Sequence, residues 1–195
     1  MPGMVTVPRR RTLLLAAMLS AGARHAIAED AAWAVLRAGG LVLFRHAIAP
    51  GGGDPAGMRL GDCATQRNLD EAGRAQARRI GEAFRTEGVT VGAVLASAWC
   101  RTRETADLAF PGQALAEPAF NSFFADRGSG AAQTDAARDI LLRWQGPGAL
   151  VVITHQVNIT ALTATLGAAI VPASGEGVVL RRRDGGLAVA GRIQP

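Results

Sequence analysis

The chain of 195 residues contains no lysine and no tyrosine, and it has only two cysteines and three histidines. All 21 basic residues are therefore arginines. Four of them lie in the first 28 residues, which contain no acidic residue, so the rest of the chain has 17 basic and 16 acidic residues. This nearly neutral balance argues against nucleic acid as a partner. With 49% apolar and 19% charged residues, the composition predicts one globular domain.

Long apolar runs are also missing, because no stretch approaches the ~20 residues of a membrane-spanning helix. The run at 13–19 follows three arginines and precedes Ala26-Ile27-Ala28, an order typical of a secretory signal peptide. We predict a signal peptide over residues 1–28 and a mature domain over residues 29–195 with no transmembrane segment. The expected location is periplasmic or secreted. An uncleaved anchor is the alternative, and the choice between the general and twin-arginine export routes stays open.

Three short apolar runs, too short for helices, indicate strands buried on both faces. They cover residues 41–44, 91–96 and 149–153. Residues 68–87 and 135–144 between them carry apolar side chains at helical spacing. This alternation predicts a three-layer α/β/α domain with a mostly parallel central sheet. Asp184-Gly185-Gly186 joins two further predicted strands, 177–183 and 187–193, in a hairpin that closes one edge antiparallel.

Two histidines remain in the predicted mature chain, and each comes directly after a predicted strand. His46 follows Arg45 at the first strand, and His155 follows the third. The second strand leads to Ser97 and, four residues on, to Arg101. Functional sites of parallel α/β sheets lie at the carboxyl ends of the strands. We therefore expect these side chains in one crevice, although a single histidine is more often a structural residue.

The residue types favour phosphoryl chemistry, because arginine binds phosphate oxygens in a fork and a neutral imidazole is a nucleophile. The spacing of histidines and cysteines fits no zinc site. The motifs of P-loop enzymes, serine hydrolases and cysteine phosphatases are absent from the sequence.

Four ordered blocks of sequence resemble the histidine phosphatase (phosphoglycerate-mutase-like) superfamily. They lie at residues 43–47, 66–77, 97–106 and 152–156, with Ala47 where glycine is usual. The resemblance implies that His46 is a nucleophile that becomes a phosphohistidine, and that Arg45, Arg101 and His155, where protonated, bind the phosphoryl group. It also implies supporting roles for Asn68 and Arg67 in phosphate binding. No metal and no cofactor are implied, because the arginines supply the positive charge.

The leaving-group acid departs from the pattern of the family. Many members carry a glutamate about two dozen residues after the pocket arginine, and Ser122 stands there in this chain. We predict Asp126 as the acid, because the aromatic pair Phe123-Phe124 should pack against the sheet and bring Asp126 to the rim of the pocket. Desolvation there would raise the pKa of its carboxyl. Glu117 and Ser122 remain alternatives.

The cysteines are even in number and follow a predicted export signal, which predicts a disulfide between Cys63 and Cys100. Two free, buried thiols are the alternative. The two cysteines and the segment 121–124 make the chain similar to exported bacterial members of the superfamily, such as those that resemble lipopolysaccharide core heptose phosphatases.

These expectations combine into an exported, metal-independent phosphomonoesterase. Its partner would be a small phosphorylated substrate, such as a phosphosugar or a phosphate of the cell envelope. The alternatives are a phosphohistidine-protein phosphatase or a mutase, or a non-catalytic protein that binds phosphate or phosphosugar.

Overall fold

The computed structural model describes residues 29–195. The predicted signal peptide and its cleavage site lie outside the described residues. The described part begins with helical residues 29–37, which lead into the first strand.

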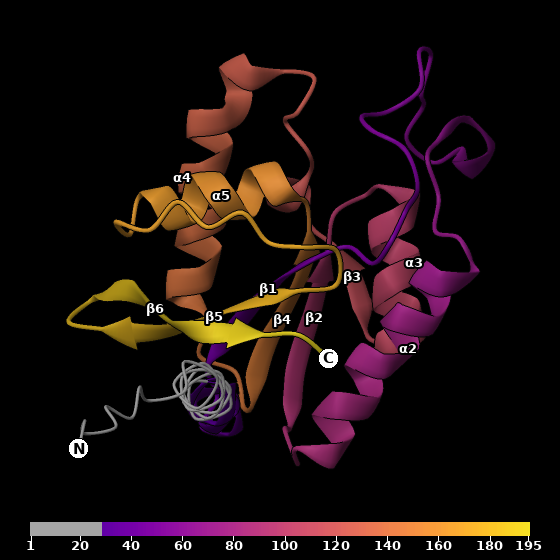
Figure 1. The fold of residues 1–195 in the computed structure, drawn as a ribbon. Coiled ribbons are helices and arrows are strands. Elements are labelled where there is room, and N and C mark those ends of the chain that lie inside the picture. Colours follow the sequence, from indigo (N-terminus) through magenta and orange to yellow (C-terminus); the bar gives the residue numbers. More distant parts are fainter. Residues whose placement is uncertain (1–28) are drawn as a thin grey trace, which may run out of the picture.

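One mixed sheet forms the centre of the domain, with the strand order β3-β2-β4-β1-β5-β6 (Figure 1). The strands are β1 (Leu41–Arg45), β2 (Val91–Ala96), β3 (Ala114–Ala116), β4 (Ala149–Thr154), β5 (Gly177–Arg183) and β6 (Gly186–Ile193). The pairs β1–β4, β4–β2 and β2–β3 are parallel, whereas β5 and β6 are antiparallel to their neighbours. The predicted fold class, mostly parallel with an antiparallel edge, is confirmed.

Helices cover both faces of the sheet (Figure 1). They are α2 (Glu71–Thr86), α3 (Cys100–Ala109), α4 (Gly130–Arg143) and α5 (Gln156–Ala164). Three single-turn 3-10 helices lie at Cys63–Thr65, Pro118–Phe120 and Arg127–Ser129. α2 begins after Asp70, whose carboxylate accepts a hydrogen bond of 2.7 Å from the backbone N–H of Gly73 and so caps the helix.

Alternate residues of each central strand belong to different hydrophobic cores. Val42 and Phe44 of β1 pack with α2, α3 and helical residues 29–37, whereas Leu41 and Leu43 pack with α4 and α5. Every residue of β4 is buried. Burial on both faces explains why β1 and β4 read as continuous apolar runs. β2 was expected to be buried in the same way, but Gly92 is exposed and three of its other residues are only partly buried.

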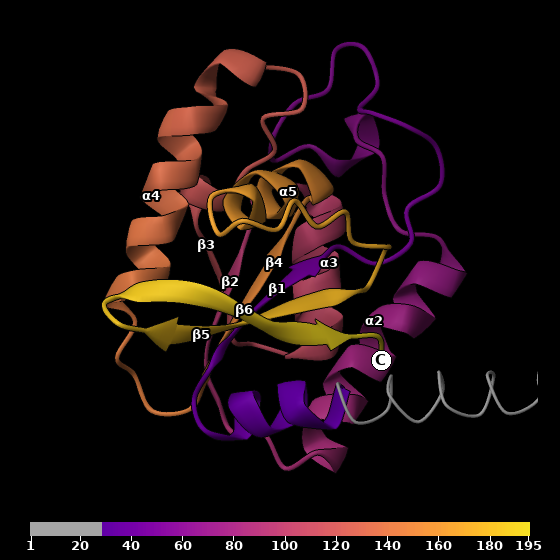
Figure 2. The same cartoon turned by 60° about the vertical axis from the view of Figure 1, so that its left-hand side comes forward.

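The β5–β6 hairpin, which comes forward in Figure 2, closes one edge of the sheet. Its turn holds Asp184 and Gly185 at φ values of 51° and 77°. Two successive positive φ angles are those of a type I′ turn, which explains the Asp-Gly pair.

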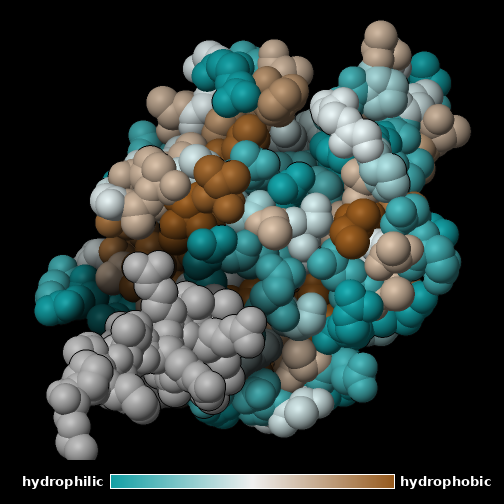
Figure 3. Space-filling model, viewed as in Figure 1, coloured by the Kyte–Doolittle hydropathy of each residue, from teal (hydrophilic) through white to brown (hydrophobic). Residues whose placement is uncertain are grey.

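The surface is hydrophilic over most of α2, whereas apolar side chains gather over α5 and the segment that follows it (Figure 3). Val171 in that segment is 59% exposed. None of the helices within residues 29–195 has both the length and the apolar character needed to cross a membrane.

Candidate active site

Three neighbouring strands end side by side and deliver the polar residues of the site. His46 follows β1, and its backbone N–H donates to the carbonyl of Thr154 at 2.9 Å. Ser97 follows β2, and its N–H donates to the carbonyl of Ile153 at 3.1 Å. His155 follows β4, which lies between them. The imidazole rings of the two histidines are therefore only 5.5 Å apart, between centroids.

The proton of His46 has a fixed place on the ring. Nδ1 lies 2.7 Å from the carbonyl oxygen of Ala47. A carbonyl only accepts, so Nδ1 carries the hydrogen and Nε2 keeps its lone pair. Burial lowers the pKa of His46 to about 3, and the charges of nearby arginines, Arg101 foremost, act in the same direction against the hydrogen bond to Ala47. His46 is consequently neutral near pH 7, with its free electron pair on Nε2.

His155 is neutral as well. Burial holds its pKa well below the usual value, and the nearby His46 and Arg101 lower the pKa further. Its Nδ1 lies 3.4 Å from Nη2 of Arg101, which can only donate, and its Nε2 lies 2.9 Å from Oγ of Ser97. The proton therefore sits on Nε2 and is donated to Ser97. The sequence interpretation considered a protonated His155, but this imidazole is neutral in the free site.

A cavity of about 530 Å³ lies at these strand ends, and four arginines line it together with both histidines. They are Arg45, Arg67, Arg101 and Arg127. Nε of Arg45 and Nε of Arg101 are buried and have no hydrogen-bond partner within residues 29–195. Guanidinium groups bind the oxygens of anions through charge-assisted hydrogen bonds, so four of them around one cavity suit an anionic ligand. Arg101 lies in the first turn of α3, where the helix end also favours negative charge.

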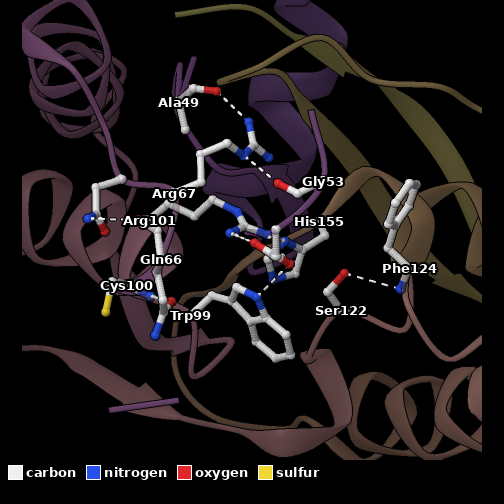
Figure 4. A network of polar contacts seen from close by, with 12 residues as sticks. Ala49, Gly53, Gln66, Arg67, Trp99, Cys100, Arg101, Ser122, Phe124 and His155 are labelled. Atoms are coloured by element: carbon white, nitrogen blue, oxygen red, sulfur yellow. Dashed lines mark hydrogen bonds and ion pairs between the residues drawn. The ribbon is translucent and has the colours of Figure 1, made fainter. Parts of the chain in front are cut away.

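Arg67 holds the glycine-rich loop that forms one wall of the cavity. Its guanidinium donates to the carbonyls of Ala49, Gly51 and Gly53, two of which are visible in Figure 4. Gly51 and Gly53 have φ values of 91° and 66°, which favour glycine. The loop is therefore pinned to the site.

Gln76 of α2 fixes the segment that follows His46. Its amide oxygen accepts from the backbone N–H of Ile48 at 3.0 Å, and its amide nitrogen donates to the carbonyl of Ser174 at 2.8 Å. A Cβ atom at Gly73 would lie 1.9 Å from the carbonyl oxygen of Ile48. The glycine thus lets α2 approach the segment after His46 closely.

The structure does not bring Asn68 to the cavity, and the supporting role predicted for it in phosphate binding is not seen. Its amide nitrogen donates to the carbonyls of Cys63 and Gln66 at 2.7 and 3.2 Å. Asn68 therefore braces the chain beside the disulfide that joins Cys63 to Cys100.

The candidate acids from the sequence also lie outside the cavity lining, except for Ser122. Asp126 is exposed, and Glu117 uses its carboxylate to cap a 3-10 helix at Ala119. The sequence predicted that Phe123 and Phe124 both pack against the sheet, and this prediction was wrong for Phe124. Phe123 is buried, but Phe124 is 51% exposed and lies under the Arg127 guanidinium, 4.9 Å from its ring centroid. Asp126 itself lines no cavity, although Phe124 and Arg127 close to it in sequence line the first one.

The sequence predicted no role for Asp54 or Trp99. The Asp54 carboxylate lies 2.5 and 3.3 Å from the two terminal nitrogens of Arg101, and Trp99 donates to it from Nε1 at 3.0 Å. The Trp99 ring in turn packs edge-on against His155, with centroids 5.3 Å apart. Figure 4 shows Trp99, Arg101 and His155 gathered at this point. An acidic residue in a loop gives no periodic signal, so only the folded chain reveals this contact.

Comparisons with known proteins support one family. The family model of the histidine phosphatase superfamily (branch 1) matches residues 41–133, a range that includes His46 and Arg101 but ends before His155. The histidine phosphatase superfamily is the family that the comparisons support. Its members are phosphatases or mutases. No curated protein sequence matches the chain significantly.

Several solved structures share the fold. Phosphoglycerate mutase from Thermus thermophilus has a TM-score of 0.58 at 20% identity, over 79% of this chain and 98% of that one. The protein histidine phosphatase SixA complexed with tungstate has a TM-score of 0.53 at 17% identity, over 80% and 97%. A phosphoserine phosphatase variant from Entamoeba histolytica, in complex with phosphoserine, has a TM-score of 0.59 at 12% identity, over 78% and 95%.

Proposed function

We propose that the protein is an exported, metal-independent phosphomonoesterase that works through a phosphohistidine on His46. One observation carries the proposal: a buried, neutral imidazole with its lone pair on Nε2 lies in a cavity lined by four arginines. A nucleophile among guanidinium groups is the arrangement that phosphoryl transfer requires.

The reaction has two steps. Nε2 of His46 attacks phosphorus, and the bond to the ester oxygen breaks. Water then attacks the phosphohistidine, releases phosphate and returns the neutral imidazole. The guanidinium groups of Arg45 and Arg101, which line the cavity, would stabilise the charge on the phosphoryl oxygens. Loss of one such preorganised donor typically costs about 3 kcal/mol of transition-state stabilisation.

The location and the substrate class follow from different observations. The basic, apolar and Ala-x-Ala order of residues 1–28 supports export, and the Cys63–Cys100 disulfide suits an oxidising compartment. A cavity of about 530 Å³ has room for more than a phosphoryl group. We therefore favour a small phosphorylated substrate outside the cytoplasm, such as a phosphosugar or a phosphate of the cell envelope.

The test is turnover with a trapped intermediate. Purified protein is mixed with p-nitrophenyl phosphate in the presence of EDTA, and a radiolabelled phosphomonoester is quenched in base, where phosphohistidine survives. We expect release of nitrophenol and acid-labile label on the protein, both lost in His46→Ala.

Saturable phosphate binding without turnover would contradict the proposal and indicate a binding protein. Full dependence on an added metal ion, or label that persists in His46→Ala, would contradict it as well.

A further inference from the structure

Asp54 is the only carboxylate that lines the main cavity within residues 29–195. It lies in the loop after β1, just beyond the glycine-rich stretch that Arg67 pins. Its side chain is 16% exposed and contacts the guanidinium of Arg101 through both oxygens. The carboxylate thus already sits against a group that binds the phosphoryl oxygens in the proposed function.

A second cavity of about 370 Å³ adjoins the first, and Asp54 lines both. The other shared lining residues are Gly53, Ser122 and Phe124. The walls of the second cavity include Pro55, Met58 and Trp99, which are largely apolar. We consider a substrate whose phosphoryl group lies against His46 and whose leaving group lies in the second cavity. The ester oxygen that joins the two groups would then lie at the boundary between the cavities, beside Asp54.

We propose that Asp54 is the acid that protonates the leaving group, with the second cavity receiving that group. This inference rests on the proposed function and completes it, because neither Asp126 nor Glu117 lines either cavity.

The protons and electrons of both steps balance. The lone pair on Nε2 of His46 forms the P–N bond while the P–O bond breaks, and the departing oxygen takes the proton of the Asp54 carboxyl. The resulting carboxylate then accepts a proton from the water that attacks phosphorus, and the P–N electrons return to Nε2. Asp54 ends protonated and His46 neutral. When phosphate leaves, the carboxyl releases its proton to solvent and regains its contact with Arg101, and the next ester to bind favours protonation again.

The free site holds Asp54 in its charged form, because the contact with Arg101 lowers the pKa of its carboxyl against the opposing effect of burial. A bound phosphoester changes this balance. Its negative oxygens engage Arg101 and place like charge beside the carboxylate, and both effects favour the protonated carboxyl. Substrate binding thus favours protonation of the Asp54 carboxyl, and the leaving group of the substrate requires that proton.

The asparagine variant separates proton donation from positioning. In Asp54→Asn the amide oxygen can still accept from Arg101 and Trp99, but the side chain has no acidic proton to give. Nitrophenolate leaves without help, whereas the alkoxide of glycerol 3-phosphate does not. The experiment measures kcat/KM for p-nitrophenyl phosphate and glycerol 3-phosphate on the same preparations of wild type, Asp54→Asn and, as a control, Asp126→Asn.

We expect Asp54→Asn to lose on the order of 10²-fold or more on glycerol 3-phosphate and less than about 10-fold on p-nitrophenyl phosphate. Asp126→Asn should keep the wild-type ratio. The ratio of the two rates does not depend on how much protein is folded. Equal losses on both substrates would show that Asp54 only positions Arg101, and unchanged rates would also overturn the inference. A wild type that turns over neither ester and forms no phosphohistidine would refute the proposed function itself, and this inference with it.

Discussion

At the scale of single residues, the chemistry of the pocket depends on where the two imidazole protons lie. The carbonyl of Ala47 holds the proton of His46 on Nδ1, and Ser97 receives that of His155 from Nε2. Both rings are neutral because burial and the surrounding arginines disfavour a further positive charge. In the proposed reaction, a neutral His46 is available as the nucleophile over a wide range of pH, but its burial makes the fold sensitive to acid.

That sensitivity gives a prediction for stability. The pKa of His46 is about 3 in the folded protein and about 6.5 when unfolded. Above pH 6.5 neither state is protonated, and as pH falls below 6.5 the unfolded state binds the proton first. The free energy of unfolding should therefore decrease, by about 2 kcal/mol from His46 between pH 6.5 and pH 5. His155 acts in the same direction.

Urea denaturation at several pH values checks this prediction. His46→Asn should flatten the decline between pH 6.5 and pH 5 relative to wild type. An identical decline in both proteins would show that His46 does not titrate as its burial requires.

Arg101 offers a second prediction, with a matched control two residues away. Arg101→Ala removes a buried guanidinium from the cavity and should lower kcat/KM on the order of 10²-fold or more. Arg103 lies in the same helix, is exposed and does not line the cavity, so Arg103→Ala should stay within about twofold of wild type. Comparable losses in the two variants would mean that general surface charge, not the pocket guanidinium, supports the reaction.

At the scale of elements, the disulfide ties two segments of the site together. Cys100 begins α3, and Cys63 lies in the loop that leads to Arg67. Gln66 adds a link, because its amide oxygen accepts from the backbone N–H of Cys100 at 2.9 Å. The bond restrains the segments that carry Arg67 and Arg101.

Removing the disulfide should destabilise the fold. Cys63 and Cys100 are 37 residues apart in sequence, and closing a loop of that length is worth about 4 kcal/mol through the entropy of the unfolded chain. We expect the double variant Cys63→Ser/Cys100→Ser to lose roughly that amount in chemical denaturation. Reductant should destabilise wild type similarly and leave the double variant unchanged, and equal stability of the two oxidised proteins would contradict the account.

The elements differ in how well the sequence predicts them. The central strands β1, β2 and β4 were predicted to within one residue at either end. In β1 and β4 the reason is burial on both faces, which makes a run continuously apolar. The strand β3 has only three residues and gives no such run. α5 is buried on several sides and mixes threonines with apolar residues, so no amphipathic period marks it.

The sequence predicted some residues of the site and missed others, depending on whether regular structure positions them. His46, His155 and Arg101 stand at strand ends or in a helix turn, where the topology alone brings them together. Asp54 lies in a glycine-rich loop, where no periodic pattern marks a functional side chain. Its place depends on the three carbonyl contacts of Arg67, which no local pattern encodes. Asn68 shows the reverse case, since a motif position suggested a phosphate contact and the folded chain uses it as a brace.

At the scale of the whole molecule, a nearly neutral domain concentrates its positive charge in one cavity. Residues 29–195 carry 17 arginines against 16 acidic residues, yet the cavity is lined by four arginines and one carboxylate. Such focusing raises the local concentration of anionic substrates and weakens with added salt. The arrangement attracts a small anion without making the whole surface basic.

The central claim is that Nε2 of His46 carries the phosphoryl group, and the most direct measurement is the position of phosphorus in the trapped intermediate. Phosphoprotein quenched in base is digested for mass spectrometry, and phosphorus–nitrogen couplings in a histidine-labelled sample identify the bonded ring nitrogen. We predict a single phosphohistidine at His46, bonded through Nε2, because Nδ1 holds its proton against the carbonyl of Ala47. Phosphorus on Nδ1 of His46, or on His155, would contradict the account.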